Sequence, residues 1–306
     1  MQGIPKFRKV LAALVACSTF YGYAQERYLD SVFSEIKLNT FVFSDTLALD
    51  VYTPVKDTVT NRPLVVLVHG GGFAIGKKDN PLEKKFCTTL AKKGYLVASI
   101  SYRLTRKGKS FGCDCPAADK VRTFRTASED VLYATRYLVR NSNQLGFDTD
   151  KIVLIGSSAG AEAVLNTVFM HNHHEFNMLP YDKLKFSGVV SFAGAVLDKD
   201  YITEHTAVPT LLFHGKKDIL VPYATAAHHY CDEDTPGYLM LAGSGSIAQR
   251  LSKLNTPYVL YFDPEGNHDW ANTAYAYTEE VSAFIKTIIL NGEWVQSKIK
   301  LNPEKY

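Results

Sequence analysis

The sequence predicts an α/β fold with a central, mostly parallel sheet, an N-terminal antiparallel hairpin and helices on both faces. Apolar runs such as residues 63–68 and 152–155 have the length and the β-branched content of buried strands. Helix-forming stretches alternate with these runs, which is the pattern of a parallel sheet covered by helices. The composition is that of an ordinary globular protein, with 46% hydrophobic and 21% charged residues in 306.

The first 24 residues have the features of an export signal. A positive segment at 6–9 precedes an unbroken apolar stretch at 10–16. Residues 22–24 then offer small side chains for cleavage before Gln25. We therefore expect a signal peptide at 1–24 and an exported protein, either periplasmic or extracellular.

Two other interpretations of this segment stay open. Residues 14–17 resemble a bacterial lipobox, in which Cys17 would be lipidated after cleavage. A permanent membrane anchor is less favoured, because the apolar core is shorter than the roughly 18 residues that span a bilayer. No later segment is long enough to span, and no internal repeat or linker interrupts the chain. We expect residues 25–306 to form a single domain.

Four cysteines remain in the exported chain, and their even number allows three disulfide connectivities in an oxidising compartment. We expect Cys113 or Cys115 to pair with Cys231, because both segments should follow strand ends on one face of the sheet. Cys87 lies in a helical pattern and is expected to be a buried free thiol. A cysteine metal site is disfavoured, since the chain has no second CxC or CxxC motif.

The charge balance argues against a nucleic-acid partner. The formal net charge is +3, and Lys and Arg are scattered along the chain rather than gathered in stripes. The sequence gives no indication of the oligomeric state.

The first predicted elements are an antiparallel hairpin, the strand at 63–68 and a helix. The hairpin strands cover 35–43 and 47–52, and the helix at 81–93 is closed by Gly94. The other predicted elements, in chain order, are the strand 95–102, an irregular loop at 103–119, a helix at 119–143 that ends before Gly146, strands at 186–192, 210–213 and 258–262, helices at 244–254 and 272–290, and a polar tail after Gly292.

The strand at 152–155 runs into Gly156-Ser157-Ser158-Ala159-Gly160 and then into a run of helix formers. A serine on such a strand-to-helix turn is held at positive φ and exposes its hydroxyl at the helix N-terminus. The flanking positions must be small, and Gly156 and Gly160 meet that need. The pattern predicts Ser158 as a nucleophile, and a plain glycine-rich turn is the alternative.

A serine nucleophile needs a base and a carboxylate that orients the base. Asp218 follows the strand at 210–213, and His268 follows the last strand. The order Ser158, Asp218, His268 is the order that strand-helix serine hydrolases require. Asp263 and Asp198 are the alternatives to Asp218.

The other acidic and imidazole side chains near these strand ends have structural explanations. We expect Asp269 to cap the final helix and His214 to brace the turn after its strand. His228 and His229 are expected to be solvated. The cluster at 171–174 could hold a metal ion, but we expect it to be solvated too.

His69-Gly70-Gly71-Gly72 follows the strand at 63–68. Three residues without side chains allow the backbone N–H groups of Gly71 and Gly72 to point at one place. Together with the N–H of Ala159 they would form an oxyanion hole, in which the loss of one donor typically costs about 10²–10³ in rate.

These motifs together resemble the α/β-hydrolase superfamily over roughly residues 32–290. The segments that carry the resemblance are His69-Gly70-Gly71-Gly72-Phe73, Ser101-Tyr102-Arg103-Leu104, Gly156-Ser157-Ser158-Ala159-Gly160, His214-Gly215-Lys216-Lys217-Asp218 with Val221-Pro222, and Gly266-Asn267-His268. Within the superfamily, the chain resembles secreted carboxylesterases of the hormone-sensitive-lipase-like and feruloyl/acetyl-esterase-like groups. It departs from the former at Ser157, Ala161 and Thr105, and it lacks an obvious N-terminal helical cap.

The resemblance implies hydrolysis of short acyl or aromatic acyl esters, with acetyl or feruloyl esters on plant polysaccharide as candidate substrates. His268, aligned by Asp218, would activate Ser158, and no metal or organic cofactor would be needed. A prolyl-oligopeptidase-like peptidase is an alternative, disfavoured because the chain has no room for the long N-terminal propeller of such enzymes. A non-catalytic binding module on the same fold is the other alternative, disfavoured because such modules normally lack the nucleophile or the histidine. The acyl and alcohol specificity depends on irregular loops that periodicity cannot fold.

Overall fold

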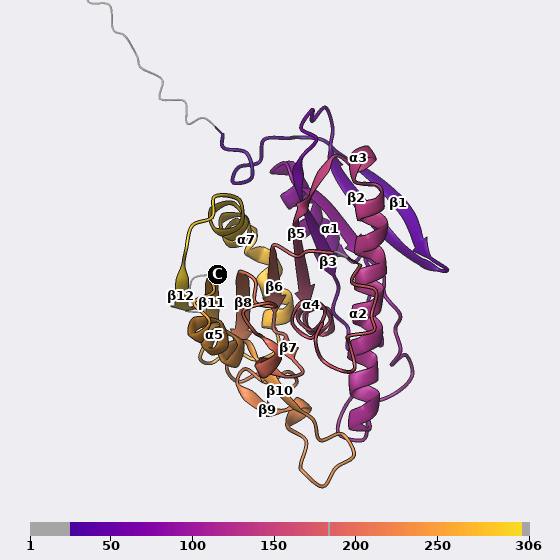
Figure 1. The fold of residues 1–306 in the computed structure, drawn as a ribbon, viewed down its shortest axis with the longest axis vertical. Coiled ribbons are helices and arrows are strands. Elements are labelled where there is room, and N and C mark those ends of the chain that lie inside the picture. Colours follow the sequence, from indigo (N-terminus) through magenta and orange to yellow (C-terminus); the bar gives the residue numbers. More distant parts are fainter. Residues whose placement is uncertain (1–24, 183, 302–306) are drawn as a thin grey trace, which may run out of the picture.

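The computed structural model describes residues 25–182 and 184–301, and a nine-stranded sheet forms its centre (Figure 1). The strand order is β1-β2-β4-β3-β5-β6-β8-β11-β12. The strands, in that order, are β1 (Ile36–Ser44), β2 (Leu47–Pro54), β4 (Leu96–Ile100), β3 (Arg62–Val68), β5 (Phe147–Ser157), β6 (Gly188–Phe192), β8 (Thr210–Gly215), β11 (Tyr258–Asp263) and β12 (Gln296–Lys300). Strands β1 and β2 form the predicted antiparallel hairpin, and the strands from β4 to β12 run parallel.

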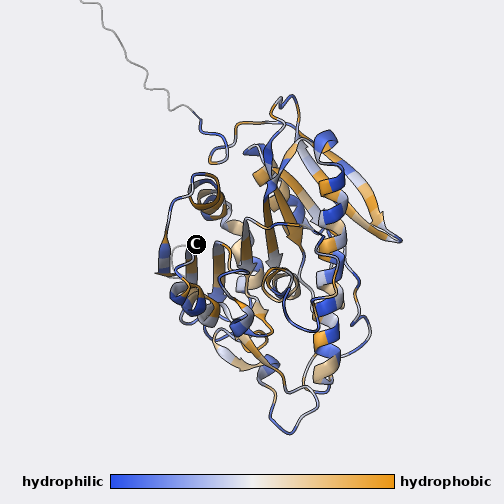
Figure 2. Cartoon of the chain, viewed as in Figure 1, coloured by the Kyte–Doolittle hydropathy of each residue, from blue (hydrophilic) through white to orange (hydrophobic). Residues whose placement is uncertain are grey.

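Buried side chains lie on both faces of the sheet because its central strands are apolar along their whole length. Leu64 and Val66 of β3 pack into one hydrophobic cluster, while Val65 and Leu67 pack into a second cluster. Since successive side chains of a strand point to opposite faces, these are the two layers of the core. Figure 2 shows the apolar strands enclosed between helices.

Each core layer is covered by its own helices. The first layer is covered by α2 (Ala117–Arg140), α4 (Ala159–Phe169) and α5 (Ser244–Lys253). The second layer is covered by α1 (Pro81–Lys92), α6 (Trp270–Thr273) and α7 (Thr278–Phe284). A short helix, α3 (Ser142–Leu145), follows α2 and ends at Gly146 in the left-handed conformation, with φ 70°. The predicted α/β fold with helices on both faces is confirmed.

The pairing of β3 with β5 determines where the loops after these strands meet. The two strands are parallel, and Val68 stands opposite Gly156. The glycine-rich loop after β3 therefore begins beside the serine-containing turn after β5. Parallel strands bring all such loops to the carboxyl edge of the sheet, where α/β proteins bind ligands.

The C-terminal part differs from the prediction. Residues 296–300, expected to belong to a polar tail, form β12, which pairs with β11. Its alternating Lys and Ile residues suit an exposed edge strand, where lysine discourages pairing with other chains. The helix predicted at 272–290 is divided into α6, a 3₁₀ turn (Ala274–Ala276), α7 and a π-helical segment (Ile285–Leu290).

A second, three-stranded antiparallel sheet was not predicted. It consists of β7 (Ala195–Val196), β10 (Met240–Gly243) and β9 (Thr225–Ala227), in that order. Strands of two to four residues are too short to show alternation in the sequence. The expected signal peptide at 1–24 lies outside the described residues, so the division into a signal and one domain stays a prediction.

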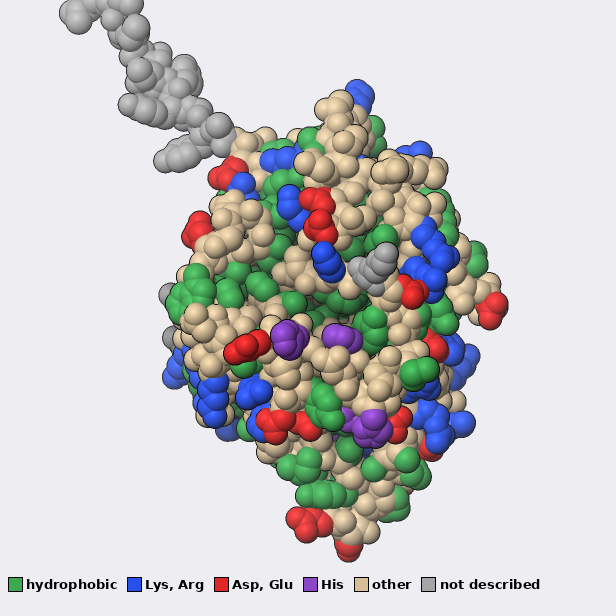
Figure 3. Space-filling view, in the orientation of Figure 1, with side chains coloured by type: hydrophobic (Ala, Val, Ile, Leu, Met, Phe, Trp, Pro, Cys, Tyr) green, Lys and Arg blue, Asp and Glu red, His purple; other side chains and the backbone are tan. Residues whose placement is uncertain are grey.

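Acidic and basic side chains are mixed over the face of the molecule seen in Figure 3. This mixture agrees with the small net charge of +3. Within residues 25–182 and 184–301, no helix has both the length and the apolar character needed to cross a bilayer.

Candidate active site

Ser158 stands between β5 and α4 in a strained backbone conformation, with φ 50° and ψ −121°. The tight turn depends on its glycines. A Cβ on Gly156 would lie 2.2 Å from the carbonyl oxygen of Gly160, and a Cβ on Gly160 would lie 2.1 Å from that of Val68. The predicted turn geometry at Ser158 is therefore present, and it places the hydroxyl at the N-terminus of α4.

Three side chains from three loops form a hydrogen-bonded chain. Ser158 Oγ lies 2.8 Å from His268 Nε2, and His268 Nδ1 lies 2.7 Å from Asp218 Oδ2. The other oxygen of Asp218 accepts hydrogen bonds of 2.9 Å from the backbone N–H groups of Leu220 and Val221. Because Asp218 is a carboxylate acceptor, Nδ1 of His268 carries a proton and Nε2 is free to accept one from the serine hydroxyl.

A second histidine contacts the same carboxylate. His214 Nε2 lies 3.2 Å from Asp218 Oδ2 and 3.1 Å from the carbonyl oxygen of Val221, while its Nδ1 lies 2.8 Å from Ser244 Oγ. Two oxygen neighbours at Nε2 require a proton there, so Nδ1 accepts from the Ser244 hydroxyl. Burial raises the pKa of Asp218, but hydrogen bonds from His214 and His268 outweigh it and hold that pKa well below its usual range. His214 braces the turn, as expected.

The two alternative carboxylates have other partners. Asp263 accepts hydrogen bonds from Trp270 Nε1 at 3.1 Å and from the backbone of Glu265 at 2.9 Å. Asp198 accepts a 2.8 Å hydrogen bond from the backbone of Asp200. Asp218 is therefore the carboxylate that reaches His268. Asp269 stands at the N-cap position of α6, but its side chain forms no capping hydrogen bond, and its carbonyl accepts from the backbone N–H groups of Asn272 and Thr273.

The glycine loop after β3 lies against the nucleophile turn. Gly71 and Gly72 have φ of 116° and 60°, values that glycine adopts without strain. The loop folds back because the N–H groups of Ala74 and Ile75 both bond to the Gly71 carbonyl at 3.0 Å. Among the described residues, no acceptor pairs with the N–H groups of Gly71 or Gly72.

His69 joins two of the sequence motifs. Its ring stacks on Tyr102 with centroids 4.5 Å apart, and its carbonyl accepts a 3.0 Å hydrogen bond from the Tyr102 hydroxyl. Its Nδ1 lies 2.7 Å from the carbonyl oxygen of Gly70. The stacking fixes the start of the glycine loop.

A cavity of about 410 Å³ opens on Ser158. The predicted site residues Ser158, His268, Gly71, Gly72 and Ala159 all line it. Asp218 lies behind His268 and is buried. The structure thus brings together every residue that the sequence proposed for the triad and the oxyanion hole.

Several other residues that line this cavity were not predicted from the sequence, among them Phe111, Glu162, His228 and His229. His228, expected to be solvated together with His229, is only 1% exposed. The ring of Phe111 packs edge-on against it, with centroids 5.1 Å apart. The one sequence signal for this group is Glu162 itself, a lone carboxylate within an otherwise apolar first turn of the helix after Ser158.

Electrostatics in this part of the cavity favours neutral groups. Burial raises the pKa of Glu162 to about 8, against the opposing effect of His229 and His268. Burial also lowers the pKa of His228 to about 3 and that of His229 to about 4. Near neutral pH, both imidazoles are therefore uncharged.

A disulfide joins Cys113 to Cys231, one of the two pairings expected. It links the loop that carries Phe111 to the segment that follows His228. Cys87 and Cys115 are buried free thiols, and burial raises the pKa of each. The disulfide thus ties together two loops that contribute to the cavity wall.

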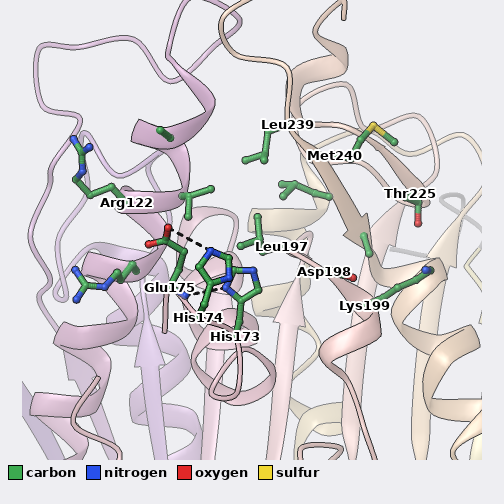
Figure 4. Close-up of a pocket in the computed structure, with 15 residues that line it drawn as sticks. Arg122, His173, His174, Glu175, Leu197, Asp198, Lys199, Thr225, Leu239 and Met240 are labelled. Atoms are coloured by element: carbon green, nitrogen blue, oxygen red, sulfur yellow. Dashed lines mark hydrogen bonds and ion pairs between the residues drawn. The ribbon is translucent and has the colours of Figure 1, made fainter. Parts of the chain in front are cut away.

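The histidines at 171–174 lie elsewhere. His173 and His174 border a second cavity of about 710 Å³ between α2 and the small sheet (Figure 4). His173 Nδ1 accepts a 3.1 Å hydrogen bond from the backbone of Glu175, and His174 Nε2 lies 3.7 Å from the Glu175 carboxylate. Although this cavity is larger, it contains neither the serine nor its partners. Among the described residues, no group of three or more His, Cys, Asp or Glu side chains could hold a metal ion.

Comparison with known proteins gives matches to esterases. The BD-FAE family matches residues 49–199. An ethyl acetate hydrolase of Pseudomonas putida is 31% identical over 117 residues, which are 38% of this chain and 32% of that protein. A phenmedipham hydrolase of Pseudarthrobacter oxydans is 34% identical over 122 residues, which are 39% of this chain and 22% of that protein. These matches thus span a third or less of the curated relatives' length.

Solved structures match over most of the chain. The butyrate-bound esterase Est2 of Thermogutta terrifontis has a TM-score of 0.58 at 19% identity, covering 84% of this chain and 95% of its own. An α/β-hydrolase from a deep-sea metagenome of the Medee basin has a TM-score of 0.55 at 18% identity, covering 83% and 95%. Together, the sheet order, the strand-serine-helix turn and these structural matches show that the chain has the α/β-hydrolase fold.

Proposed function

We propose that this protein is a serine carboxylesterase in which Ser158, His268 and Asp218 act as the catalytic triad. The observation that carries this proposal is the hydrogen-bonded chain from Ser158 Oγ to His268, at 2.8 Å, and on to Asp218, at 2.7 Å, at the wall of an open cavity. The esterase matches agree with this chemistry.

The geometry suits acyl transfer. His268 Nε2 takes the proton of the serine hydroxyl while Ser158 Oγ attacks the ester carbonyl. The N–H groups of Gly71, Gly72 and Ala159 stabilise the oxyanion, and the alcohol leaves with the proton from His268. Water, deprotonated by the same imidazole, then cleaves the acyl-enzyme. Every proton transfer in this scheme uses groups of this chain.

The proposed substrates are esters with short acyl or aromatic acyl groups. A cavity of about 410 Å³ has room for a small acyl group or one aromatic ring, and the Phe111 ring in its wall suits an aromatic or sugar ring. The names of the matched relatives include an ethyl acetate hydrolase. Acetyl or feruloyl esters on plant polysaccharide are the specific candidates.

Export is the proposed localisation. The Cys113–Cys231 disulfide supports it, because such bonds persist mainly in oxidising compartments. Cleavage before Gln25 gives a free exported protein, and lipidation at Cys17 is the alternative. Mass spectrometry of the mature N-terminus, after expression of the full chain in a bacterial host, distinguishes the two.

Hydrolysis of 4-nitrophenyl acetate by the wild type and by Ser158→Ala tests the proposed activity. We expect turnover by the wild type and its loss in the variant, together with loss of labelling by an organophosphate serine probe. Retention of near wild-type turnover in Ser158→Ala would contradict the assignment of the nucleophile. Labelling without turnover of any ester would favour a binding module over an enzyme.

A further inference from the structure

Glu162 is a buried carboxylic acid close to the nucleophile. It lies one helical turn after Ser158, and its backbone N–H donates a 2.9 Å hydrogen bond to the Ser158 carbonyl. Its side chain is 2% exposed and borders the same cavity as the serine. Glu162 therefore occupies a position from which it can contact a substrate held at Ser158.

The carboxyl group of Glu162 faces His228 without a complete set of partners. Glu162 Oε1 lies 3.3 Å from His228 Nε2. Even so, neither Glu162 Oε1 nor His228 Nδ1 forms a hydrogen bond to any of the described residues. Buried polar atoms are nearly always hydrogen-bonded in folded proteins, so two such atoms in one pair of adjacent side chains require an explanation. A purely structural role would be better served by an apolar or fully paired residue.

The imidazole is held firmly in place. The backbone N–H of His228 donates a 2.8 Å hydrogen bond to Leu239, and the next residue, His229, donates one of 2.9 Å to Leu220. The rings of Phe111 and Phe124 pack edge-on against the His228 ring, at 5.1 and 6.0 Å between centroids. The position of the imidazole is thus fixed by surrounding structure, which is what a binding site requires.

The backbone beside His228 is also strained. His229 and Tyr230 both have positive φ, of 59° and 52°, which non-glycine residues rarely adopt. Strain of this kind is concentrated at functional sites, where the surrounding structure maintains it. Here it turns the loop so that both His228 and His229 border the cavity.

We propose that Glu162 and His228 form a subsite that binds a hydroxyl group of the substrate by hydrogen bonds, with the Phe111 ring beside the carbon skeleton that carries this hydroxyl. The inference rests on the proposed esterase function and names its substrate class, hydroxylated esters. A hydroxyl donates one hydrogen bond and accepts others, so a single hydroxyl can bond to the carboxyl group and to the imidazole of this adjacent pair.

The charges around the subsite favour a neutral ligand over an anion. Asp218 is a buried carboxylate nearby, and its charge acts on Glu162. The buried ammonium group of Lys120 also acts on Glu162, but it already donates a 2.7 Å hydrogen bond to the carbonyl of Gly237. With Glu162 largely protonated below its pKa of about 8 and His228 neutral, the subsite offers hydrogen bonds without net charge.

The hydroxyl could belong to the acyl part of the ester, as in a phenolic acid, or to the alcohol part, as in a sugar. Two pairs of substrates distinguish these sources. The acyl pair is methyl 4-hydroxycinnamate and methyl cinnamate. The alcohol pair is a monoacetylated methyl xyloside and an acetylated tetrahydropyranol without free hydroxyls. We expect wild-type kcat/KM to favour the hydroxylated member of one pair on the order of 10- to 100-fold, the effect of one or two strong hydrogen bonds.

Variants of the subsite should remove this preference. Glu162→Leu and His228→Phe are expected to lower kcat/KM for the hydroxylated substrate more than kcat/KM for the matched substrate without the hydroxyl, so that the preference falls below about threefold. Glu162→Gln, which keeps two polar atoms, should restore part of the preference. Thr167→Val serves as the matched control, because Thr167 is also a buried polar residue of α4 but does not border the cavity. It should keep the full preference.

The activity toward 4-nitrophenyl acetate and the labelling of Ser158 separate this inference from the esterase proposal and show that each variant is folded. The subsite is overturned if the wild type hydrolyses this ester but shows no preference within either pair. It is also overturned if Glu162→Leu and His228→Phe, both labelled at Ser158, keep the preference. Absence of labelling and turnover in the wild type would contradict the esterase and, with it, the subsite.

Discussion

His214 and His268 share one oxygen atom of Asp218. The Oδ2 atom lies 3.2 Å from His214 Nε2 and 2.7 Å from His268 Nδ1. His268 borders the cavity, whereas His214 is completely buried and never reaches it. Of the two imidazoles, only His268 contacts Ser158, so His214 acts by holding the carboxylate in position and by favouring its charged form.

Replacing His214 should therefore weaken catalysis without removing any group that contacts substrate. We expect His214→Phe to lower kcat for 4-nitrophenyl acetate on the order of 10- to 100-fold, the effect of losing a hydrogen bond to a buried charge. Loss of this bond also raises the pKa of Asp218, so activity should fall further as the pH decreases. Ser244→Ala, which removes only the contact at His214 Nδ1, is the control and should cost much less. Equal losses in both variants would contradict this role of His214.

Asp218 and Asp263, two of the three candidate carboxylates, can be compared directly. Asp218→Asn should reduce kcat by about 10⁴-fold, because an amide no longer selects the imidazole tautomer that can accept the serine proton. Asp263→Asn should leave kcat within about tenfold, since Asp263 bonds to Trp270 and to the backbone of Glu265 rather than to His268. Steady-state kinetics at neutral pH measures both. The reverse ranking would show that the carboxylate has been misassigned.

Gly71 and Gly72 should respond differently to alanine although both have positive φ. A Cβ at Gly71 would lie 2.1 Å from the carbonyl oxygen of Ile75, whereas a Cβ at Gly72 would meet nothing within 4 Å. We expect Gly72→Ala to lower the free energy of unfolding by about 1–2 kcal/mol, the cost of a left-handed alanine. Gly71→Ala should cost more than about 3 kcal/mol or prevent folding. Urea unfolding checks both, and equal costs would contradict the described loop.

Much of the site could be predicted from the sequence because its parts lie at strand ends. Apolar runs predicted β3, β5, β8 and β11, and parallel pairing necessarily brings the loops after them to one edge. The order of serine, aspartate and histidine along the chain then selected Ser158, Asp218 and His268. Their hydrogen bonds agree with that selection.

The wall of the cavity could not be predicted in the same way. Phe111 and His228 lie in irregular loops whose course depends on a disulfide, left-handed residues and backbone bonds between distant segments. None of these has a periodic pattern. The same holds for β12, whose polar sequence forms a strand because β11 provides an open edge.

The disulfide should stabilise both the protein and its cavity wall. It closes a loop with a sequence separation of 118 residues, for which chain entropy predicts about 4–5 kcal/mol. We expect Cys113→Ser, or reduction of the wild type, to lower the free energy of unfolding by up to that amount and to raise KM more than it lowers kcat, because the wall loses its tether. Cys115→Ala should change the free energy of unfolding and KM much less. An unchanged unfolding midpoint in Cys113→Ser would contradict this role.

Glu162 should make stability depend on pH. Burial raises its pKa from 4.5 to about 8 in the folded protein, so the unfolded chain releases this proton first. Its contribution to stability is then greatest below pH 4.5, falls as the pH rises toward 8, and is constant above. Glu162→Gln has no proton to release. Urea unfolding at pH 4 and pH 8 gives the difference in the free energy of unfolding between this variant and the wild type. We expect that difference to shift in favour of the variant at pH 8. The same difference at both pH values would mean that Glu162 titrates normally.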